Sequence, residues 1–306
     1  MLEKGLGTPD NPLLHGIYEW SLLAAGATFL AMDMMLRHEV LTAFNPLGGF
    51  HHAMAGRAEG FCYINDVVIA IRHALNAFAF DKIAYVDIDA HHGNGVQEAF
   101  YDDDRVLFIS IHETGRTLYP WSGKEDEKGS GRGEGFNINI PLEPGADDEV
   151  YDYAVQEIMI PALEAFAPRL VVAVVGADTM ASDPLTHLKL TNNAYQRVLG
   201  QIVTICPRVL GLGGGGYDLY RTARCWTLAW AIINMISPSD EFAGLVGGMM
   251  FGPEMEVGSL YDFPRQSMGE EKKWAMAEIQ RVSGYLKENV LPVHTASSRL
   301  NPAPNL

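Results

Sequence analysis

The amino-acid sequence predicts an α/β fold, an open and mostly parallel sheet sandwiched by helices. Short apolar, β-branched segments alternate along the chain with stretches of helical periodicity. These segments are hydrophobic at nearly every position, which is typical of parallel strands buried on both faces. Most of them also end in histidine, aspartate or glycine, and ligands bind beyond the carboxyl ends of such strands. We therefore expect the functional residues at one edge of the sheet.

The expected elements follow from these patterns in chain order. Short apolar segments predict strands, at residues 40–44, 82–89, 105–111, 136–142, 169–178 and 208–212. Longer stretches with a period near 3.6 predict helices, at residues 17–37, 64–78, 147–166, 192–204, 219–233 and 269–288. The glycine- and charge-rich segment 122–135 predicts a loop rather than a domain boundary. We expect a single domain over residues 1–306.

Composition argues against several classes of function. The 306 residues are 48% hydrophobic and have a net charge of −16, which argues against nucleic acid as a partner. The longest apolar segments, such as 225–236, are shorter than the ~20 residues that span a membrane, and no signal peptide is evident. Three cysteines without a C-x-x-C pair favour reduced thiols. The sequence thus predicts a cytoplasmic protein without a membrane partner.

The segment "VDIDAHHGNG" predicts a metal site. In an extended strand, Asp87, Asp89 and His91 alternate onto one face. Carboxylate oxygens with an imidazole nitrogen suit Zn²⁺, Fe²⁺ or Mn²⁺, and three protein ligands plus water make an open, catalytic site. Asp178 closes a different strand and offers a further carboxylate. The alternatives are a capped strand end with solvated carboxylates and, for Asp178, the N-cap of the next helix.

A tandem pair of histidines, His51 and His52, follows the first predicted strand after two glycines. A single histidine is more often structural, but a pair at the same edge as a metal site favours acid–base catalysis. A metal-bound water needs a base, and a leaving amine needs an acid. Two imidazoles held by different partners can divide these tasks, because their pKa values are then set apart.

The segment "LGLGGGGY" has the spacing of a dinucleotide-binding turn at Gly211, Gly213 and Gly216. Such a turn also needs an acidic residue that closes a strand about 20 positions later, and the pattern there is helical. No Gly-Lys-Ser/Thr follows, which argues against a P-loop. The glycines instead permit positive φ angles and close backbone approach. They would bring the phenol of Tyr217 to the metal edge, where it could donate a hydrogen bond to an oxyanion.

Five segments in register give the chain a family resemblance: "GGFHHA", "GFCYIND", "VDIDAHHGNGVQEAF", "GADTMASDPL" and "LGLGGGGY" with "ARCW". The sequence resembles the zinc-dependent histone deacetylase superfamily over roughly residues 5–235. The segments "GLGTPDNP" and "AFNP" look most similar to its bacterial acetoin-utilization branch. The resemblance implies an arginase-like fold and a hydrolase that removes acetyl groups from N-acetyl-lysine side chains, with an acetylated bacterial protein as its substrate.

The resemblance also implies roles for the residues that match the family motifs. The ligands of Zn²⁺, or of Fe²⁺ in cells, would be Asp89, His91 and Asp178. The catalytic histidine pair, its two partners and the tyrosine that polarises the acetyl carbonyl would be His51, His52, Asp87, Asn94 and Tyr217. An asparagine at the second partner position would stabilise the imidazolium form of His52 less than an aspartate.

Substrate and a second cation are implied in the same way. A narrow tunnel for the acyl-lysine stem would be lined by Gly60, Phe61, Tyr119 and Leu185. At its rim, Asp10 would grip the substrate backbone. A structural K⁺ or Na⁺ ion beside the zinc would be bound by Asp87, Asp89, His91, Ser110 and Ile111.

The sequence departs from the family pattern at its start. Family members usually have roughly 80–100 residues before "GLGTPDNP", including early strands of the sheet, and this sequence lacks them. One edge of the sheet and one wall of the tunnel are expected to lack their usual cover. A second protomer in a homo-oligomer could supply it.

Three other functions stay open from the sequence. An acetylpolyamine amidohydrolase would suit the acidic composition. A binuclear manganese ureohydrolase of arginase type needs further bridging aspartates, but Met180 stands two residues after Asp178, which favours a one-metal site. A catalytically impaired, metal-binding interaction protein is the alternative from a different class, although every residue that catalysis needs is present.

Overall fold

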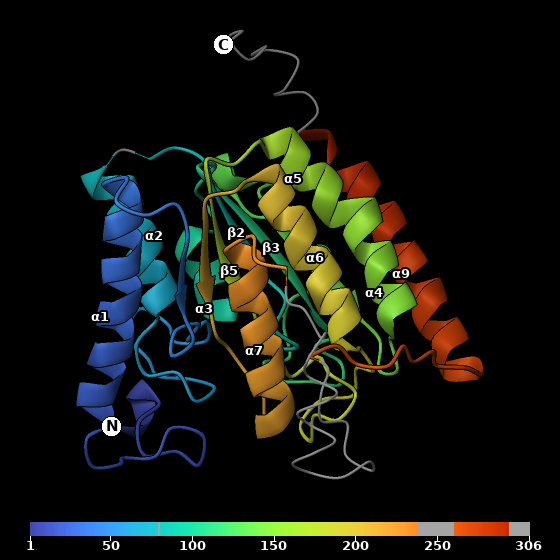
Figure 1. The fold of residues 1–306 in the computed structure, drawn as a ribbon, viewed down its shortest axis with the longest axis horizontal. Coiled ribbons are helices and arrows are strands. Elements are labelled where there is room, and N and C mark those ends of the chain that lie inside the picture. The colour runs from blue at the N-terminus through green and yellow to red at the C-terminus, as the bar shows by residue number, and fades with distance from the viewer. Residues whose placement is uncertain (79, 238–259, 294–306) are drawn as a thin grey trace, which may run out of the picture.

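The computed structural model describes residues 1–78, 80–237 and 260–293. In this part of the chain, strands form one parallel sheet in the order β1-β6-β5-β2-β3-β4 (Figure 1). The strands are β1 (Ala43–Asn45), β2 (Ile83–Asp87), β3 (Val106–Glu113), β4 (Asn137–Leu142), β5 (Leu170–Val174) and β6 (Val209–Leu212). Each overlaps a segment in which the apolar pattern predicts a strand. The predicted open, parallel α/β sheet is confirmed.

Helices connect these strands. They are α1 (Ile17–Leu36), α2 (Asp66–Ala77), α3 (Asn94–Phe100), α4 (Asp148–Ala154), α5 (Ile160–Phe166), α6 (Asn192–Ile205), α7 (Leu219–Ile233) and α9 (Glu270–Asn289), with short 3-10 turns η1 (Leu2–Lys4) and η2 (Gly131–Gly133). Several begin at a residue whose side chain accepts a hydrogen bond from the first turn, as Asn65 does for α2 and Asp218 for α7. Among the described residues, no helix has both the length and the apolar character that crossing a membrane requires.

Two helical features differ from the sequence prediction. Helix α3 is not predicted, because its 7 residues are too few to show a clear helical period. The single helix predicted over 147–166 is divided into α4, the π-helical segment η3 (Val155–Met159) and α5. Pro161 stands at the start of α5. A proline has no N–H to donate and crowds the turn before it, so the regular hydrogen-bond ladder is interrupted there.

The sheet is the middle layer of a sandwich (Figure 1). Helices α1, α2 and α3 cover one face, where apolar side chains pack around Tyr85 and Phe108. Helices α4 to α7 and α9 cover the other face, against side chains such as Val86 and Ile109. Every residue of β2, β3 and β5 is buried. This two-sided burial explains why these strands show no alternation of polar and apolar residues.

The strand order places a crevice at the carboxyl edge of the sheet. After β2 the chain continues to β3 on one side, and after β5 it continues to β6 on the other. The loops that leave these two adjacent strands therefore separate, and open α/β sheets bind ligands at such a point. Asp89 and His91 lie in the loop after β2, and Asp178 lies in the loop after β5. The topology itself thus brings them to one place.

Helix α1 is tied to the loop that contains the tandem histidines. Thr28, buried in the middle of α1, donates a hydrogen bond to Asp66 Oδ2 over 2.6 Å. The buried Asp66 carboxylate also accepts from the backbone N–H groups of Gly49, at 3.0 Å, and Phe50, at 2.8 Å. One carboxylate thus joins α1 and the start of α2 to the segment directly before His51.

We expect Asp66→Ala to lower the free energy of unfolding by about 3 kcal/mol, because it leaves the buried N–H of Gly49 and the part-buried N–H of Phe50 without an acceptor. Urea denaturation followed by circular dichroism measures the change. Asp81→Ala is the matched control, since Asp81 is an exposed carboxylate paired with Arg169 at 3.0 Å, and losing such a pair changes stability little. Equal effects of the two substitutions would contradict the bridging role of Asp66.

Candidate active site

A cavity of about 360 Å³ opens at the carboxyl edge of the sheet. Its walls come from the loops after β1, β2 and β6 and from the segment before α2. Of the residues that the sequence singles out, those that line it are His51, His52, Gly60, Phe61, Asp89, His91, Gly216 and Tyr217. Residues far apart in the sequence therefore meet in one cavity.

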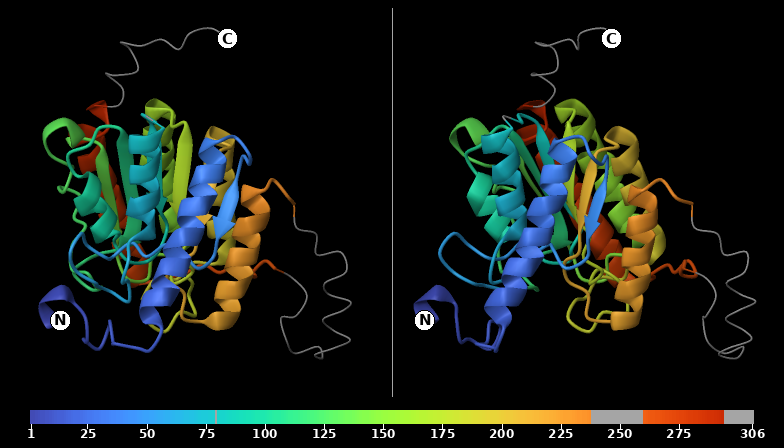
Figure 2. Two further views of the ribbon diagram at one scale, coloured as in Figure 1. Left: turned by 90° about the vertical axis from the view of Figure 1, so that its left-hand side faces the viewer. Right: turned by 60° about the vertical axis from the view of Figure 1, so that its left-hand side comes forward.

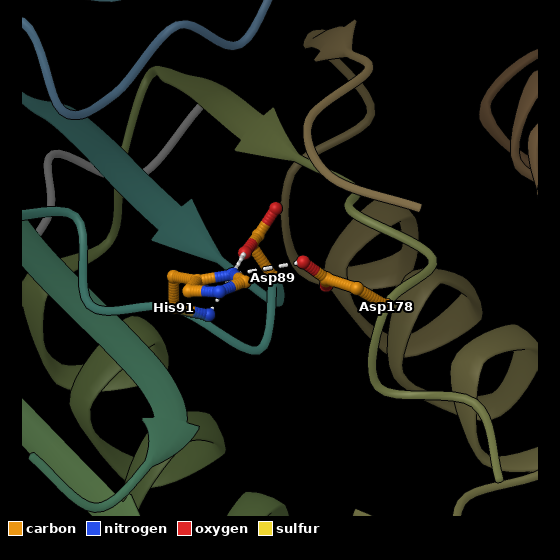
Figure 3. Close-up of side chains that lie close together, drawn as sticks. All are labelled: Asp89, His91 and Asp178. Carbon is orange, nitrogen blue, oxygen red and sulfur yellow. Dashed lines mark hydrogen bonds and ion pairs between the residues drawn. The ribbon is translucent and has the colours of Figure 1, made fainter. Parts of the chain in front are cut away.

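Asp89, His91 and Asp178 converge beside this cavity (Figure 3). His91 Nδ1 lies 3.0 Å from Asp89 Oδ1 and 2.9 Å from Asp178 Oδ2. One ligand atom from each of the three side chains lies within 4.8 Å of the others, and all three residues are buried. The three side chains are therefore close enough to bind one metal ion together.

The donor set fits a divalent cation. Burial raises the pKa of the Asp178 carboxyl to about 7, and the negative charge of Asp89 acts in the same direction. Two carboxylates this close in a dry environment repel each other unless a positive charge lies between them. Two oxygen donors and one imidazole nitrogen also match a catalytic metal site, in which water or substrate takes the remaining position. The buried group could therefore hold a metal ion.

Backbone N–H groups orient the two carboxylates. Gly215 donates to Asp89 Oδ2 over 2.6 Å, and Ala90 donates to Asp178 Oδ1 over 2.8 Å. Gly215 belongs to the loop after β6, so the ends of three adjacent strands hold the two acids. Hydrogen bonds of this kind fix which carboxylate oxygen faces a metal.

The tandem histidines have different partners. His51 Nδ1 lies 2.7 Å from Asp87 Oδ2, and His52 Nδ1 lies 2.7 Å from Asn94 Oδ1. The two Nε2 atoms are 3.1 Å apart, and both rings are buried. Because an amide oxygen only accepts hydrogen bonds, Nδ1 of His52 bears a proton toward Asn94. In the neutral ring, Nε2 is then the basic atom.

These partners separate the pKa values of the two histidines. Burial disfavours the charged form of His51, but the Asp87 and Asp89 carboxylates outweigh this effect and raise its pKa to about 9. Burial lowers the pKa of His52 well below its usual value, and the positive charge of His51 lowers it further. Asn94 contributes a hydrogen bond but no negative charge to oppose these effects. At neutral pH the pair therefore combines a charged His51 with a neutral His52.

The glycine segment after β6 forms a bend that only residues without a Cβ adopt easily. Gly214 has a φ of 127° and Gly216 a φ of 146°. A Cβ on Gly215 would lie 2.1 Å from Asp178 Oδ2, so the backbone here approaches the metal-binding group closely. The bend places Tyr217 in the lining of the cavity. The structure thus gives these glycines a role without a nucleotide.

Two residues predicted for a substrate tunnel line the cavity, and a third packs against His52. Gly60 and Phe61 line it, and the Phe61 ring lies edge-on to the Tyr217 ring with 6.1 Å between centroids. The Tyr119 ring is edge-on to the ring of His52, with 5.1 Å between centroids. A Cβ on Gly60 would lie 2.5 Å from the His52 ring. A side chain at this position would therefore push against the His52 ring.

The other predicted residues lie away from the cavity lining. Leu185 is 45% exposed, and Asp10 is exposed in the loop before α1. Ser110 and Ile111, predicted for a monovalent cation, are buried in β3. Ser110 pairs in register with Asp87 of β2. The tunnel rim and the monovalent site stay predictions.

The sequence patterns give no role to two residues that hold Asp87 and Tyr217 in place. The Tyr85 hydroxyl donates to Asp87 Oδ2, and Asp183 Oδ2 accepts from the Tyr217 N–H over 2.8 Å. Tyr85 stands two residues before Asp87 on the same strand, so the strand period could have identified it. Asp183 gives no comparable signal, because its contact joins loops after β5 and β6 that only the folded sheet brings together.

Fold and site together define the class of protein. An open parallel sheet, with an Asp-His-Asp group and a buried histidine pair at its carboxyl edge, is the arginase-like arrangement of metal-binding hydrolases. A family model described as the histone deacetylase domain matches residues 2–233. The chain belongs to the histone deacetylase family.

Individual relatives agree with this assignment. Acetoin utilization protein AcuC of Bacillus subtilis is 40% identical over 243 residues, which cover 78% of this chain and 62% of that protein. Histone deacetylase 8 of Xenopus tropicalis is 34% identical over 289 residues, which cover 94% of this chain and 77% of that protein. The chain thus spans less than two thirds of the AcuC relative. The predicted resemblance to the acetoin-utilization branch is confirmed.

A solved structure shows the same fold. The crystal structure of a histone deacetylase homologue from Aquifex aeolicus matches with a TM-score of 0.80 and 33% identity. The match covers 92% of this chain and 78% of that one. The arginase-like fold predicted from the resemblance is therefore confirmed.

We expect Gly215→Ala to weaken the binding of a divalent metal ion, with Zn²⁺ as the probe, about tenfold or more, because the added Cβ would displace a carboxylate of the Asp-His-Asp group. Isothermal titration calorimetry of the metal-free protein measures the affinity. Gly200→Ala is the matched control, since a Cβ on this glycine of α6 meets nothing within 4 Å. An unchanged affinity in Gly215→Ala would show that the close approach of the backbone does not matter.

Proposed function

We propose that this protein is a zinc-dependent amidohydrolase that removes acetyl groups from N-acetyl-lysine side chains of proteins. The proposal rests mainly on one observation, that the histidine pair and the metal-binding group share a cavity, with His51 Nε2 4.0 Å from Asp89 Oδ1. A water molecule and an acetyl carbonyl can meet both groups there. Membership of the histone deacetylase family supports the class of reaction.

The proposed zinc ligands are Asp89, His91 and Asp178. Two carboxylate oxygens and an imidazole suit Zn²⁺ or Fe²⁺ better than a copper ion. When bound, such an ion polarises the acetyl carbonyl and lowers the pKa of the attacking water. The protein residues around it then have to move protons and stabilise charge.

The histidine pair supplies the proton transfers. Neutral His52 accepts a proton from the attacking water at Nε2, because its Nδ1 proton is held by Asn94 Oδ1 at 2.7 Å. His51, kept charged by Asp87, lies beside it and stabilises the negative charge that develops on the carbonyl oxygen. The proton on His52 then moves to the amine nitrogen as the carbon–nitrogen bond breaks. The second proton of the water also passes to the amine, so acetate and a protonated amine result, and His52 is neutral again.

Tyr217 is proposed to donate a hydrogen bond to the same oxygen. Burial raises the pKa of its hydroxyl, so the phenol keeps its proton at neutral pH and remains a donor. Its ring and that of Phe61 also form apolar walls at the cavity. Such walls suit the methylene stem of an acylated lysine.

Two other functions are alternatives to the deacetylation of proteins. The net charge of −16 favours cationic substrates, so an acetylated polyamine is the second candidate. A metal-binding protein without activity is the third. The intact hydrogen bonds of His51 and His52 argue against it.

We expect the zinc-loaded protein to release acetate from an acetyl-lysine peptide with a kcat/KM about tenfold or more above that for acetylspermidine. Removal of the metal with a chelator should abolish turnover, and added Zn²⁺ should restore it. A preference for acetylspermidine would favour the second candidate. Stoichiometric metal binding without turnover of either substrate would favour the third.

We expect Tyr217→Phe to lower kcat about 100-fold or more, because the oxyanion loses a hydrogen-bond donor. Zn²⁺ affinity should stay within about twofold, since the phenol is not a proposed ligand. Tyr220→Phe is the matched control, because Tyr220 is a nearby tyrosine that is 56% exposed and outside the cavity lining. Full activity of Tyr217→Phe would refute the proposed role.

We expect Asn94→Asp to move the acidic limb of the kcat/KM profile. Activity falls as the pH drops through the pKa of His52, because protonated His52 cannot accept the proton of water. A carboxylate at position 94 stabilises the imidazolium and raises this pKa, so the limb should move about 1–2 pH units upward. Asn289→Asp, at an exposed asparagine that ends α9, is the control. An unmoved limb would count against His52 as the base.

A further inference from the structure

The proposed reaction gives no role to one fully buried acid, Glu113. This residue is the last of β3, its side chain is 0% exposed, and it does not line the cavity. A buried carboxylate is stable only where hydrogen-bond donors or a cation compensate for the water that it loses. The donors around Glu113 therefore show what it holds in place.

Donors from two separate loops meet at this carboxylate. The Thr117 hydroxyl donates to Glu113 Oε1 over 2.8 Å. The His187 N–H donates to Oε2 over 2.8 Å, and the ring atom Nδ1 of His187 lies 2.8 Å from Oε1. Because a carboxylate oxygen only accepts hydrogen bonds, Nδ1 bears the proton in this contact. One side chain thus joins the loop after β3 to the segment after β5.

The backbone of Glu113 gives this bridge a fixed base. Its N–H donates to the Ala90 carbonyl over 2.9 Å, and it pairs in register with Leu142 of β4. Ala90 lies between Asp89 and His91 in the chain, so Glu113 is also tied to the loop with two members of the metal-binding group. The bridge therefore has a fixed place relative to that group, and the two loops attach to it.

The first attached loop contains Tyr119. Thr117 stands two residues before Tyr119, whose ring is edge-on to the His52 ring with 5.1 Å between centroids. A Cβ on Gly60 would lie 2.8 Å from the Tyr119 ring, and both Gly60 and His52 line the cavity. A displacement of Thr117 would therefore move an aromatic ring that packs behind the cavity wall.

The second attached segment, residues 183–187, is bonded to two residues of the active site. Asp183 Oδ2 accepts from the Tyr217 N–H over 2.8 Å, and the Thr186 hydroxyl donates to the carbonyl oxygen of Asp178. The last residue of the segment bonds to the buried carboxylate. The loops that leave the strands gather at the carboxyl end of the sheet, in the lower part of both views of Figure 2. One carboxylate there anchors segments on both sides of the catalytic groups.

We propose that Glu113 is a positioning residue that fixes the distance between the Tyr119 loop and segment 183–187, and through them the width of the passage for an acylated lysine. This inference rests on the proposed function. A passage that loosens loses contacts with the substrate stem, and these contacts are alike in the ground state and the transition state. The effect therefore falls on KM more than on kcat. Glu113 itself lies outside the cavity and acts only through the two segments.

Substitution of Glu113 in the zinc-loaded full chain tests this role. We expect Glu113→Ala to raise KM for an acetyl-lysine peptide about tenfold or more, with kcat within about threefold and Zn²⁺ affinity within about twofold. Glu113→Gln should keep KM within about threefold, because its amide oxygen can accept from the His187 N–H while its NH₂ group donates to the Thr117 hydroxyl. Asp33→Ala is the matched control, since Asp33 pairs with a histidine, His73 at 3.0 Å, between α1 and α2. Its KM should be unchanged.

Hydrogen exchange of the backbone amides tests the bridge independently of activity. In Glu113→Ala, residues 114–119 and residues 183–187 should both exchange about tenfold or more faster, because both segments lose the same anchor. Thr117→Val removes the hydroxyl, keeps the shape of the side chain and should speed exchange in the first segment alone. This variant decides the matter where Glu113→Ala fails to fold.

The outcomes separate this proposal from the proposed function. A wild-type protein that binds Zn²⁺ but does not turn over the peptide would refute the function, and exchange would then decide the bridge. Unchanged exchange in either segment of Glu113→Ala would overturn the bridge, and so would an equal rise in Asp33→Ala. A wild-type KM in Glu113→Ala, or a Glu113→Gln variant as defective as Glu113→Ala, would overturn the positioning role.

Discussion

Two buried carboxylates that face each other set the main constraint on this structure. Asp89 and Asp178 both lie within 3.0 Å of the same His91 nitrogen, and both side chains are buried. Like charges at this distance require a cation or a proton between them, and the backbone must present N–H groups to hold them. The loops after β2 and β6 supply these N–H groups, from Ala90 and Gly215, and the loop after β5 supplies Asp178. Much of the irregular structure at the carboxyl edge follows from it.

The glycines after β6 allow the backbone to come close enough to hold these two carboxylates. Gly215 donates its N–H to Asp89 and has no side chain that would collide with Asp178. The same bend brings Tyr217 to the cavity, where its N–H donates a hydrogen bond to Asp183. Spacing alone made these glycines resemble a nucleotide-binding turn. In the folded chain the loop has a different role, because the N–H of Gly215 donates to the Asp89 carboxylate of the protein itself and not to a nucleotide phosphate.

The outer layers of the fold also bear on the chemistry. Asp66 connects α1, through Thr28, to the backbone that precedes the histidine pair. The position of His51 thus depends on contacts of a helix that does not itself line the cavity.

The sequence by itself determined the kind of fold and the chemistry of the site. Apolar runs placed the strands, and the polar residues that end them identified the edge where Asp89, His91 and Asp178 meet. The same reasoning could also predict hydrogen bonds within one strand, such as the one from the Tyr85 hydroxyl to Asp87. Only the tertiary structure decided which histidine has the raised pKa, how the glycine bend approaches Asp178 and that Asp183 accepts from the Tyr217 N–H. These depend on burial and on contacts between distant strands, and neither has a local signature in the sequence.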